Sequence, residues 1–232
     1  MNPSEEVLEL LDGVKDYAHR GCWERRVPEN SLTAIWRAVE KGLGLEIDVH
    51  LTKDGKVAVF HDFTLRRMCG VKGRIEDMTM DGLKRLRLKR SPDTIPSLRD
   101  VLAVTDGRVP LLIELKCNLK CNANEEALCD ALIDELKDYN GKYMFIGFSE
   151  KAAKYLKDKG YTIALSCFKP KMPELDFKPD VLLCNILGIP RSAEKREPYP
   201  PFISWTINSK AGKRKSEKCC IATIYDTKRF NF

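Results

Sequence analysis

The sequence lacks the features that would place the chain in a membrane or build it around zinc. No window approaches the roughly 20 consecutive apolar residues that a transmembrane helix needs. The acidic, amphipathic start, MNPSEEVLELLDGVKDY, predicts no secretory leader. Nine cysteines are present, but their spacing contains no CxxC pair and no Cys/His zinc pattern. We therefore expect a cytoplasmic protein with reduced, mostly buried thiols and no stable membrane insertion.

Signals for nucleic-acid binding are also scarce. The net charge of +6 is moderate for 232 residues, and it favours anionic partners only through the long-range field. One basic run, KAGKRKSEK at 210–218, could bind anions or nucleic acid, but no aromatic residues interleave with it for base stacking. A solvated face is the preferred interpretation, so we expect no nucleic-acid partner. The sequence leaves the oligomeric state open.

The sequence does contain a regular alternation of short apolar runs and helical patterns. Helical patterns occupy residues 31–41, 97–104, 125–136 and 150–159. Continuous apolar strands that alternate with helices predict parallel strands covered by those helices. The eight runs that predict strands are GVKDYAHRG (13–21), LGLEIDVHL (43–51), VPLLIELK (109–116), KYMFIGFS (142–149), YTIALSC (161–167), PDVLLCN (179–185), PFISWTIN (201–208) and CCIATIYD (219–226).

Eight such units predict an α/β fold, a TIM-type (β/α)₈ barrel that takes residues 1–232 as one domain. A doubly wound open sheet is the second choice, because counting strands does not establish closure. The last two crossovers, ILGIPRSAEKREPY with its prolines and the short SKAGKRKSEK, predict irregular or degenerate helices. The long, basic and polar segment 63–96 predicts an excursion over one rim after the second strand.

One strand carries charged side chains where a core would place Val or Ile. Glu46, Asp48 and His50 lie at alternate positions of GLEIDVHL, so they share one face of the strand. Two inward carboxylates repel each other and lose hydration unless a positive group lies between them. Mg²⁺ and Ca²⁺ prefer oxygen ligands, so this face predicts a divalent cation site. For His50, a structural role is the preferred interpretation.

A hairpin is expected to bring a further histidine to this face. Asp54 and Gly55 predict a turn between GLEIDVHL and the apolar run VAVFHD. If the turn has two residues, Asp48 stands directly opposite His61 on the same face of the ladder. The hairpin would then fold His61 back onto the acidic pair.

More polar residues stand at the ends of predicted strands, where barrel enzymes build their sites. The run GVKDYAHRG ends in His19 and Arg20, and VPLLIELK ends in Glu114 and Lys116. Three predicted strands therefore deliver acids, bases and cations to one rim. Trp205 in FISWT is expected either to line the same pocket against glycerol or to pack in the core. Asn30 in PENS is expected to cap the following helix.

Together these motifs resemble the glycerophosphodiester phosphodiesterase family. HRG, PENS, EIDVHLTKDG, FHD, L-R, IPSL-DVL, IELK, GFS, SWTIN and ATIYD occur in this order over nearly the whole chain. The resemblance implies a TIM-type barrel that hydrolyses glycerophosphodiesters to an alcohol and sn-glycerol 3-phosphate with a divalent cation, Mg²⁺ or Ca²⁺. It assigns metal binding to Glu46, Asp48 and Glu114, catalysis to His19 and His61, and phosphate contacts to Arg20 and Lys116.

The resemblance leaves several points open. His19 is preferred as the base and His61 as the acid, while either water or the substrate's 2-hydroxyl could be the nucleophile. The final segment, SKAGKRKSEKCCIATIYDT, departs from the family, with Cys220 where a glycine often falls, so the far wall of the pocket and the preferred alcohol are not assigned.

Two other functions compete with this one. A related phospholipase-type phosphodiesterase acting on a lipid headgroup would need an apolar surface, which the polar segment 63–96 does not supply. A non-enzymatic binder of anions or nucleic acid would act through residues 210–218.

Overall fold

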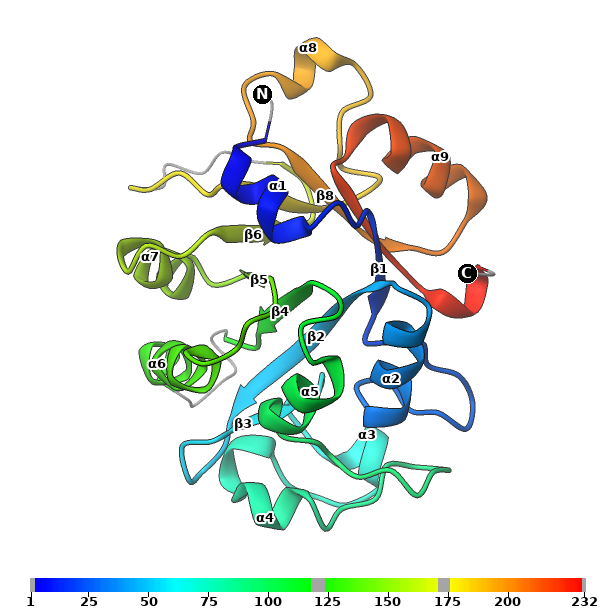
Figure 1. The fold of residues 1–232 in the computed structure, drawn as a ribbon, viewed down its shortest axis with the longest axis vertical. Helices are drawn as coiled ribbons and strands as arrows, with labels where there is room; N and C mark the ends of the chain where they lie inside the picture. Colours follow the sequence, from blue (N-terminus) through cyan, green and yellow to red (C-terminus); the bar gives the residue numbers. More distant parts are fainter. Residues whose placement is uncertain (1–2, 118–123, 171–175, 231–232) are drawn as a thin grey trace.

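The computed structural model describes residues 3–117, 124–170 and 176–230 (Figure 1). At its centre eight parallel strands close into a barrel in the order β1-β2-β4-β5-β6-β7-β8-β9, with β1 paired to both β2 and β9. The predicted barrel is confirmed, and the open-sheet alternative is wrong. The barrel strands are β1 (Asp16–His19), β2 (Gly44–Leu51), β4 (Leu111–Leu115), β5 (Tyr143–Gly147), β6 (Ile163–Cys167), β7 (Val181–Asn185), β8 (Phe202–Ile207) and β9 (Ala222–Tyr225).

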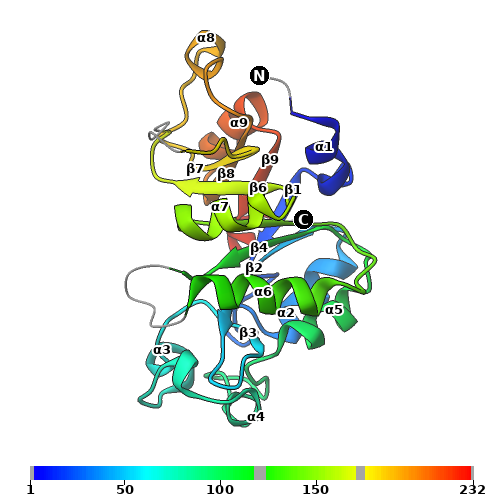
Figure 2. The same cartoon turned by 90° about the vertical axis from the view of Figure 1, so that its left-hand side faces the viewer.

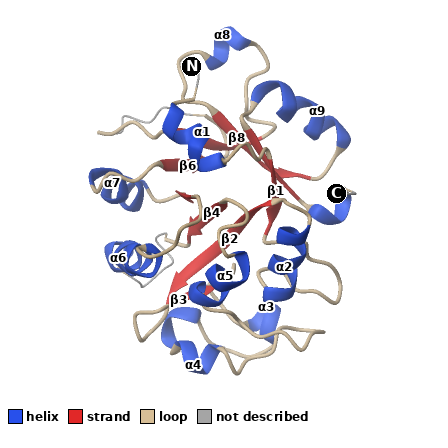
Figure 3. Cartoon of the chain, in the orientation of Figure 1, coloured by secondary structure: helices blue, strands red, loops and turns tan. Residues whose placement is uncertain are grey.

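Helices surround the strands (Figure 3), and the four helical patterns of the sequence all form. None of the described helices combines the length and apolar character needed to cross a bilayer. The longer helices are α1 (Glu5–Leu11), α2 (Leu32–Glu40), α5 (Leu98–Thr105), α6 (Glu125–Leu136), α7 (Glu150–Asp158) and α9 (Lys210–Cys219). The short ones are α3 (Arg66–Cys69), α4 (Met80–Leu83), α8 (Ala193–Arg196), η1 (Ile75–Asp77) and η2 (Thr227–Arg229).

The two late crossovers differ from each other. The crossover after β7 contains only the four-residue α8, as its prolines predict. The crossover after β8 contains the regular ten-residue α9, so the expectation of a degenerate helix is wrong there. Its first turn is capped by Ser209, whose hydroxyl accepts a hydrogen bond from the Gly212 amide at 3.2 Å.

Alternation along the strands separates two apolar layers. On β2 the outward residues Leu45, Ile47 and Val49 are fully buried against the helices. The barrel interior is apolar at its N-terminal end, which α1 closes with Val7 and Leu11. The rest of that inner cluster comprises Tyr17, Leu112, Met144, Ile146, Ala164, Val181, Leu183, Ile203, Ala222 and Ile224. The polar inward residues therefore lie at the C-terminal rim.

The hairpin after β2 forms with a different register from the one predicted. β3 (Val57–Val59) pairs antiparallel with β2, with Val49 opposite Val59. The turn is one residue longer than expected, since the Gly55 amide donates to the Thr52 carbonyl at 3.0 Å and Gly55 has a left-handed φ of 72°. The Phe60 amide thus donates to the Asp48 carbonyl at 2.9 Å, and the predicted pairing of Asp48 with His61 is wrong by one residue.

Segment 63–96 forms the predicted excursion and has a small core of its own. It contains α3, η1 and α4, at the lower end of the molecule in Figures 1 and 2. Although the segment is polar overall, its apolar residues pack together with two residues of the hairpin. This satellite cluster consists of Ala58, Phe60, Leu65, Ile75, Met80, Leu83, Leu88 and Ile95.

One expectation about the cysteines is wrong. Cys167 and Cys184 are register partners at the ends of β6 and β7, and a disulfide joins them. The expectation of reduced, buried thiols holds for Cys22 and Cys129, which are buried as free thiols.

The start of β2 gives a test of the packing inside the barrel. A Cβ added at Gly44 would overlap the ring of the buried Tyr17, lying 2.8 Å from its Cζ, whereas one at Gly147 would meet Leu115 at an ordinary 3.4 Å. We expect Gly44→Ala to lower the free energy of unfolding by ~1–3 kcal/mol and Gly147→Ala to cost clearly less. Chemical denaturation of both variants measures this, and equal losses would contradict the packing described.

Candidate active site

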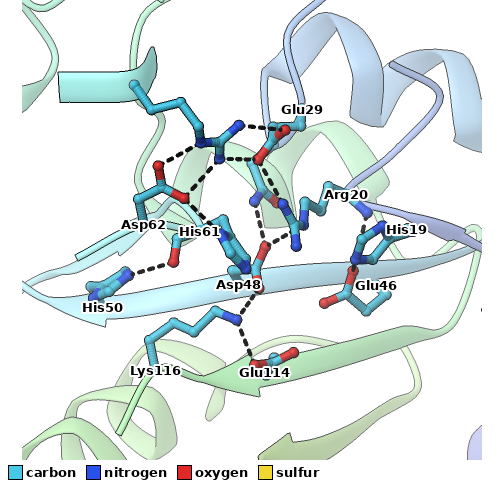
Figure 4. A network of polar contacts seen from close by, with 12 residues as sticks. His19, Arg20, Glu29, Glu46, Asp48, His50, His61, Asp62, Glu114 and Lys116 are labelled. Carbon is cyan, nitrogen blue, oxygen red and sulfur yellow. Dashed lines mark hydrogen bonds and ion pairs between the residues drawn. The ribbon is translucent and has the colours of Figure 1, made fainter. Parts of the chain in front are cut away.

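Neighbouring strands bring the predicted charged residues together at the C-terminal rim of the barrel (Figure 4). In the parallel register, His19 of β1 lies beside Glu46 of β2, and Asp48 lies beside Glu114 of β4. Carboxylate oxygens of Glu46, Asp48 and Glu114 all lie within 4.8 Å of one another. The shared strand face predicted for the β2 acids is therefore present.

Asp48 is the most heavily bonded member of this acid cluster. Its side chain is 1% exposed. The Lys116 ammonium lies 2.6 Å from Oδ1, and the Arg20 Nε lies 3.2 Å from Oδ2. The side-chain amide of Asn30 donates to Oδ2 at 2.7 Å. Lys116 also reaches Glu114 at 2.5 Å, so its ammonium bridges two of the three acids.

Glu46 and Asp48 are equally buried but have opposite electrostatic environments. Burial raises the pKa of Glu46 well above its ordinary value, and the charges of Asp48 and Glu114 raise it further. Burial would also raise the pKa of Asp48, but Lys116 and Arg20 hold that pKa far below its usual range. The cluster thus contains one firmly ionised acid, Asp48, and one, Glu46, that forms no ion pair with a Lys or Arg side chain among the described residues.

The acid cluster fits a divalent metal ion. All of its donors are carboxylate oxygens, which suit Mg²⁺ and Ca²⁺. Within the described residues, Oε1 of Glu46 is buried and has no hydrogen-bond partner. A buried acceptor without a partner is costly, and a bound cation would satisfy both this oxygen and the excess negative charge.

The loop after β1 holds Arg20 in an unusual conformation. Arg20 has a φ of 59°, in the left-handed region that non-glycine residues seldom adopt. Its amide donates to the Glu46 carbonyl at 3.0 Å and to the Glu46 carboxylate at 3.1 Å. Gly21 follows at φ 80°, and an added Cβ there would lie 2.7 Å from the backbone of Ala34. The HRG motif thus packs tightly against α2.

Asn30 was expected to cap α2, and this expectation is wrong. The N-cap is Ser31, whose hydroxyl accepts from the Ala34 amide at 3.2 Å. Asn30 has a left-handed φ of 57°, and its backbone N–H donates to the Arg20 carbonyl at 3.0 Å. This conformation leaves the Asn30 side chain to bind Asp48.

The two histidines of the predicted catalytic pair have different surroundings. His19 Nε2 lies 3.9 Å from Glu46. Burial lowers the pKa of His19 to about 3, and the Arg20 charge acts in the same direction, so the imidazole is neutral near pH 7. His61 is one-third exposed, and its Nδ1 lies 2.7 Å from the Asp62 carboxylate. If Nδ1 donates this bond, Nε2 is the ring nitrogen available to a ligand.

His50 lies further along the same strand face and contacts the backbone rather than the acid cluster. Its Nε2 lies 3.4 Å from the His61 carbonyl, and its ring meets Phe63 edge-on at 5.2 Å. Burial lowers the pKa of His50 to about 4. These contacts support the structural role expected for His50.

Sequence reasoning missed the residues that connect Arg20 with His61. Glu29 accepts from Arg20 at 2.7 Å and from Arg67 at 2.6 Å. Arg67 also donates from Nε to Asp62 at 2.6 Å, and Asp62 contacts His61. A continuous chain of charge-assisted bonds therefore runs from the loop after β1 to the loop after β3. Glu29 lies in the PENS motif and Arg67 in the L-R motif. Both residues were therefore part of motifs found in the sequence, but no role was assigned to either of them from the sequence.

A cavity of ≈ 470 Å³ opens beside the acid cluster. His61, Glu114, Lys116 and Phe148 are among its lining residues. Trp205 contacts this wall through Phe148, at 5.9 Å between ring centroids, and its indole N–H donates to the Leu183 carbonyl at 3.0 Å. Every predicted site residue thus belongs to one rim of the barrel.

Comparison with known proteins gives a consistent result. The profile of the glycerophosphoryl diester phosphodiesterase family matches residues 19–171. A glycerophosphodiester phosphodiesterase of Bacillus altitudinis is 38% identical over 110 residues, which is 44% of this chain and 44% of that protein. Glycerophosphodiester phosphodiesterase 1 of Homo sapiens is 36% identical over 107 residues, 42% of this chain and 32% of that protein. The match therefore spans less than half of each relative.

Solved structures show the same fold. A phosphodiesterase of Oleispira antarctica, in complex with the product sn-glycerol-3-phosphate, superposes with a TM-score of 0.79 at 24% identity, over 93% of this chain and 94% of that one. A glycerophosphodiester phosphodiesterase of Thermotoga maritima gives 0.73 at 24% identity, over 93% and 96%.

Arg67 provides a test of the chain of bonds. The His61 and Arg67 contacts hold the pKa of Asp62 below its usual range despite burial. We expect Arg67→Met to raise the Asp62 pKa, because one of the groups that stabilise the carboxylate is lost. A carboxylate whose pKa is lowered by folding stabilises the protein above the pKa it has in the unfolded chain, and this stabilisation is lost as the pH falls. Because the folded-state pKa of Asp62 is higher in Arg67→Met, this variant should lose less stability than the wild type as the pH falls. NMR titration measures the shift, with Arg66→Met as control; an unchanged Asp62 pKa in Arg67→Met would contradict the proposed connection.

Proposed function

The chain belongs to the glycerophosphoryl diester phosphodiesterase family, and we propose that it hydrolyses glycerophosphodiesters to an alcohol and sn-glycerol 3-phosphate. The observation that carries the proposal is the convergence of three carboxylates, two cations and two histidines on one rim beside a cavity. An anionic diester and a divalent cation are the ligands that such a mixture of charges suits.

The acid cluster of Glu46, Asp48 and Glu114 would hold the cation, Mg²⁺ or Ca²⁺. When bound, the cation polarises a phosphate oxygen and neutralises charge that develops in the transition state. The chain's own contribution is to place the three carboxylates side by side, with Glu46 and Asp48 buried, and to keep Asp48 ionised through Lys116 and Arg20.

Arg20 and Lys116 would bind the phosphate. Lys116 has three N–H donors, and its contacts with Asp48 and Glu114 leave one for a phosphate oxygen. Arg20 has five, and its contacts with Glu29 and Asp48 likewise leave donors for a second oxygen. The acids that pair with these cations also fix their positions, so the phosphate would enter a preformed site.

The two histidines would divide the proton transfers. His19 lies 3.9 Å from Glu46 at the edge of the acid cluster, where the charges of Asp48 and Glu29 favour its protonated form, so we assign it as the base that accepts a proton from the nucleophile. A protonated His61 would be paired by the Asp62 carboxylate, so it is suited to protonate the departing alcohol oxygen as the acid. Water and the substrate's 2-hydroxyl both remain candidates for the nucleophile.

Removing either imidazole should abolish most turnover. We expect His19→Ala and His61→Ala each to lower kcat by about 10²–10⁴-fold, the usual contribution of a positioned acid or base. The measurement is release of sn-glycerol 3-phosphate from glycerophosphocholine, with circular dichroism to verify folding. Near-normal turnover by either folded variant would refute the role assigned to that histidine.

Metal dependence is tested separately from turnover. We expect calorimetry to detect binding of Mg²⁺ or Ca²⁺ to the wild type and at least about tenfold weaker binding by Glu46→Gln, since one ligand carboxylate is lost. Asp134→Asn removes an exposed carboxylate of α6 and should leave binding unchanged. Equal affinities in the wild type and Glu46→Gln would show that the acid cluster is not the cation site.

A further inference from the structure

A second cavity lies between the loop after β1 and the excursion. Its volume is ≈ 550 Å³, and the described residues that line it all differ from those of the cavity beside the acid cluster. Three segments that are far apart in the sequence enclose it: the loop after β1, the excursion 63–96 and the helix η2 after β9. The space is therefore built by the tertiary fold and not by a single basic run of the chain.

The lining of this second cavity is strongly basic. It contains five cationic side chains and two carboxylates, a net of three positive charges. The cations are Arg25, Arg67, Lys89, Arg90 and Lys228. Both carboxylates are already paired, since Glu24 lies 2.6 Å from Arg37 and Glu29 lies 2.6 Å from Arg67. The carboxylates therefore leave most of the positive charge of the lining uncompensated.

Three of these cations have no carboxylate partner. In the part of the chain that the structure describes, the ion pairs around this cavity include none with Arg25, Arg90 or Lys228. All three side chains are exposed, so solvent and salt screen their mutual repulsion. A cavity lined mainly by one sign of charge nevertheless raises the local concentration of ions of the opposite sign. An anion is therefore the ligand that this lining suits.

The amount of charge indicates the class of anion. A phosphate monoester carries about −1.5 to −2 charges near pH 7, so one such group neutralises only part of the lining. Two linked phosphate groups match it more closely, and arginine side chains bind phosphate oxygens through paired N–H donors. The Lys228 ammonium lies over the Trp23 ring, 3.0 Å from its centroid, so this ring face is already covered. We therefore expect recognition through charge and not through stacking of a base.

Arg67 connects the second cavity with the candidate active site. Of the five N–H groups of its guanidinium, one on Nε and one on Nη2 donate to Asp62, and one on Nη1 and one on Nη2 donate to Glu29. One N–H group of Nη1 is left for a ligand in the cavity. An anion there would offset the positive charge that holds both carboxylates. Glu29 in turn binds Arg20. Asp62 contacts His61, the proposed acid.

We propose that the second cavity is an anion site, which binds the diphosphate group of a small molecule and, through Arg67, slows turnover at the acid cluster. The direction follows from the order of the contacts, because Arg67 holds Asp62 and Asp62 orients His61. A weaker hold on Asp62 leaves the proposed acid less well placed. Binding at the cavity is independent of the proposed function, whereas its effect on turnover rests on that function.

The indole N–H signals of the three tryptophans test binding without turnover. Trp23 lines the second cavity, Trp205 contacts the wall of the first through Phe148, and Trp36 is exposed on α2. Proton–nitrogen NMR would follow these signals while pyrophosphate or inorganic phosphate is added without divalent cations. We expect pyrophosphate to shift the Trp23 signal saturably, at a concentration at least about tenfold lower than phosphate, because each further charge-assisted hydrogen bond contributes about tenfold in affinity.

A variant and a matched control locate the site. Arg25→Gln/Arg90→Gln removes two cations of the second cavity. The control, Arg85→Gln/Arg99→Gln, removes two exposed arginines that line neither cavity. We expect the first variant to bind pyrophosphate at least about tenfold more weakly and the control to bind it like the wild type.

Several results of this titration would overturn the site. These are a shift of the Trp205 signal alone, equal shifts of Trp23 and Trp36, and a Trp23 shift that is the same in all three proteins. ADP should bind about as tightly as pyrophosphate. Clearly tighter binding of ADP would contradict recognition by the diphosphate group alone.

Turnover tests the connection through Arg67. Release of sn-glycerol 3-phosphate from saturating glycerophosphocholine would be measured with excess divalent cation, with and without pyrophosphate. We expect pyrophosphate to lower kcat at least about fivefold, the lower end of typical coupling between sites, in the wild type and the control but not in Arg25→Gln/Arg90→Gln. An equal fall in all three proteins would indicate loss of the cation or binding at the acid cluster, and would overturn the connection. No turnover by the folded wild type would overturn the proposed function, while a saturable Trp23 shift would still support the anion site.

Discussion

The buried charge of Asp48 is the constraint on which the arrangement of the rim depends. An ionised carboxylate that is 1% exposed requires compensation from its neighbours, and residues of two loops supply it. Arg20 comes from the loop after β1, Asn30 from the approach to α2, and Lys116 from the end of β4. Each of these groups is thereby fixed in place. Two of the residues that satisfy Asp48, Arg20 and Lys116, are also those proposed to bind the phosphate, so one electrostatic requirement both stabilises the rim and prepares it for an anion.

The second feature of the rim is its division into unlike sides. From Arg20 through Glu29 and Arg67 to Asp62 and His61, charge-assisted bonds join the loops after β1 and β3. The loops after β5, β6 and β7, with the end of β8, instead present aromatic and aliphatic surface. The cavity lies between the two sides, since both His61 and Phe148 line it. A phosphodiester carries its charge at one point and its substituents on either side, and this division of the rim corresponds to that chemistry.

Much of this could be predicted from the sequence because burial leaves a strong local signal. Each of the eight apolar runs contains a strand, and alternation along β2 correctly placed Glu46 and Asp48 on one face. What failed depended on detail that alternation does not encode. The left-handed conformation of Gly55 added one residue to the turn and shifted the hairpin register. Asn30 bonds to Asp48, 18 residues away in the sequence, and Glu29 bonds to Arg67, 38 residues away. Neither contact therefore leaves a local sequence pattern. The ring contacts among Phe148, Phe168 and Trp205 likewise join two crossovers and strand β8, which lie far apart in the sequence.

The central claim is that this rim hydrolyses a glycerophosphodiester on the headgroup side of the phosphate. Phosphorus NMR of glycerophosphocholine incubated with the purified protein tests it most directly, because the two possible phosphomonoester products have different signals. The account predicts that sn-glycerol 3-phosphate accumulates with Mg²⁺ or Ca²⁺ and that an excess of chelator stops it. Accumulation of phosphocholine, or an unchanged diester signal with folded protein and either cation, would contradict it.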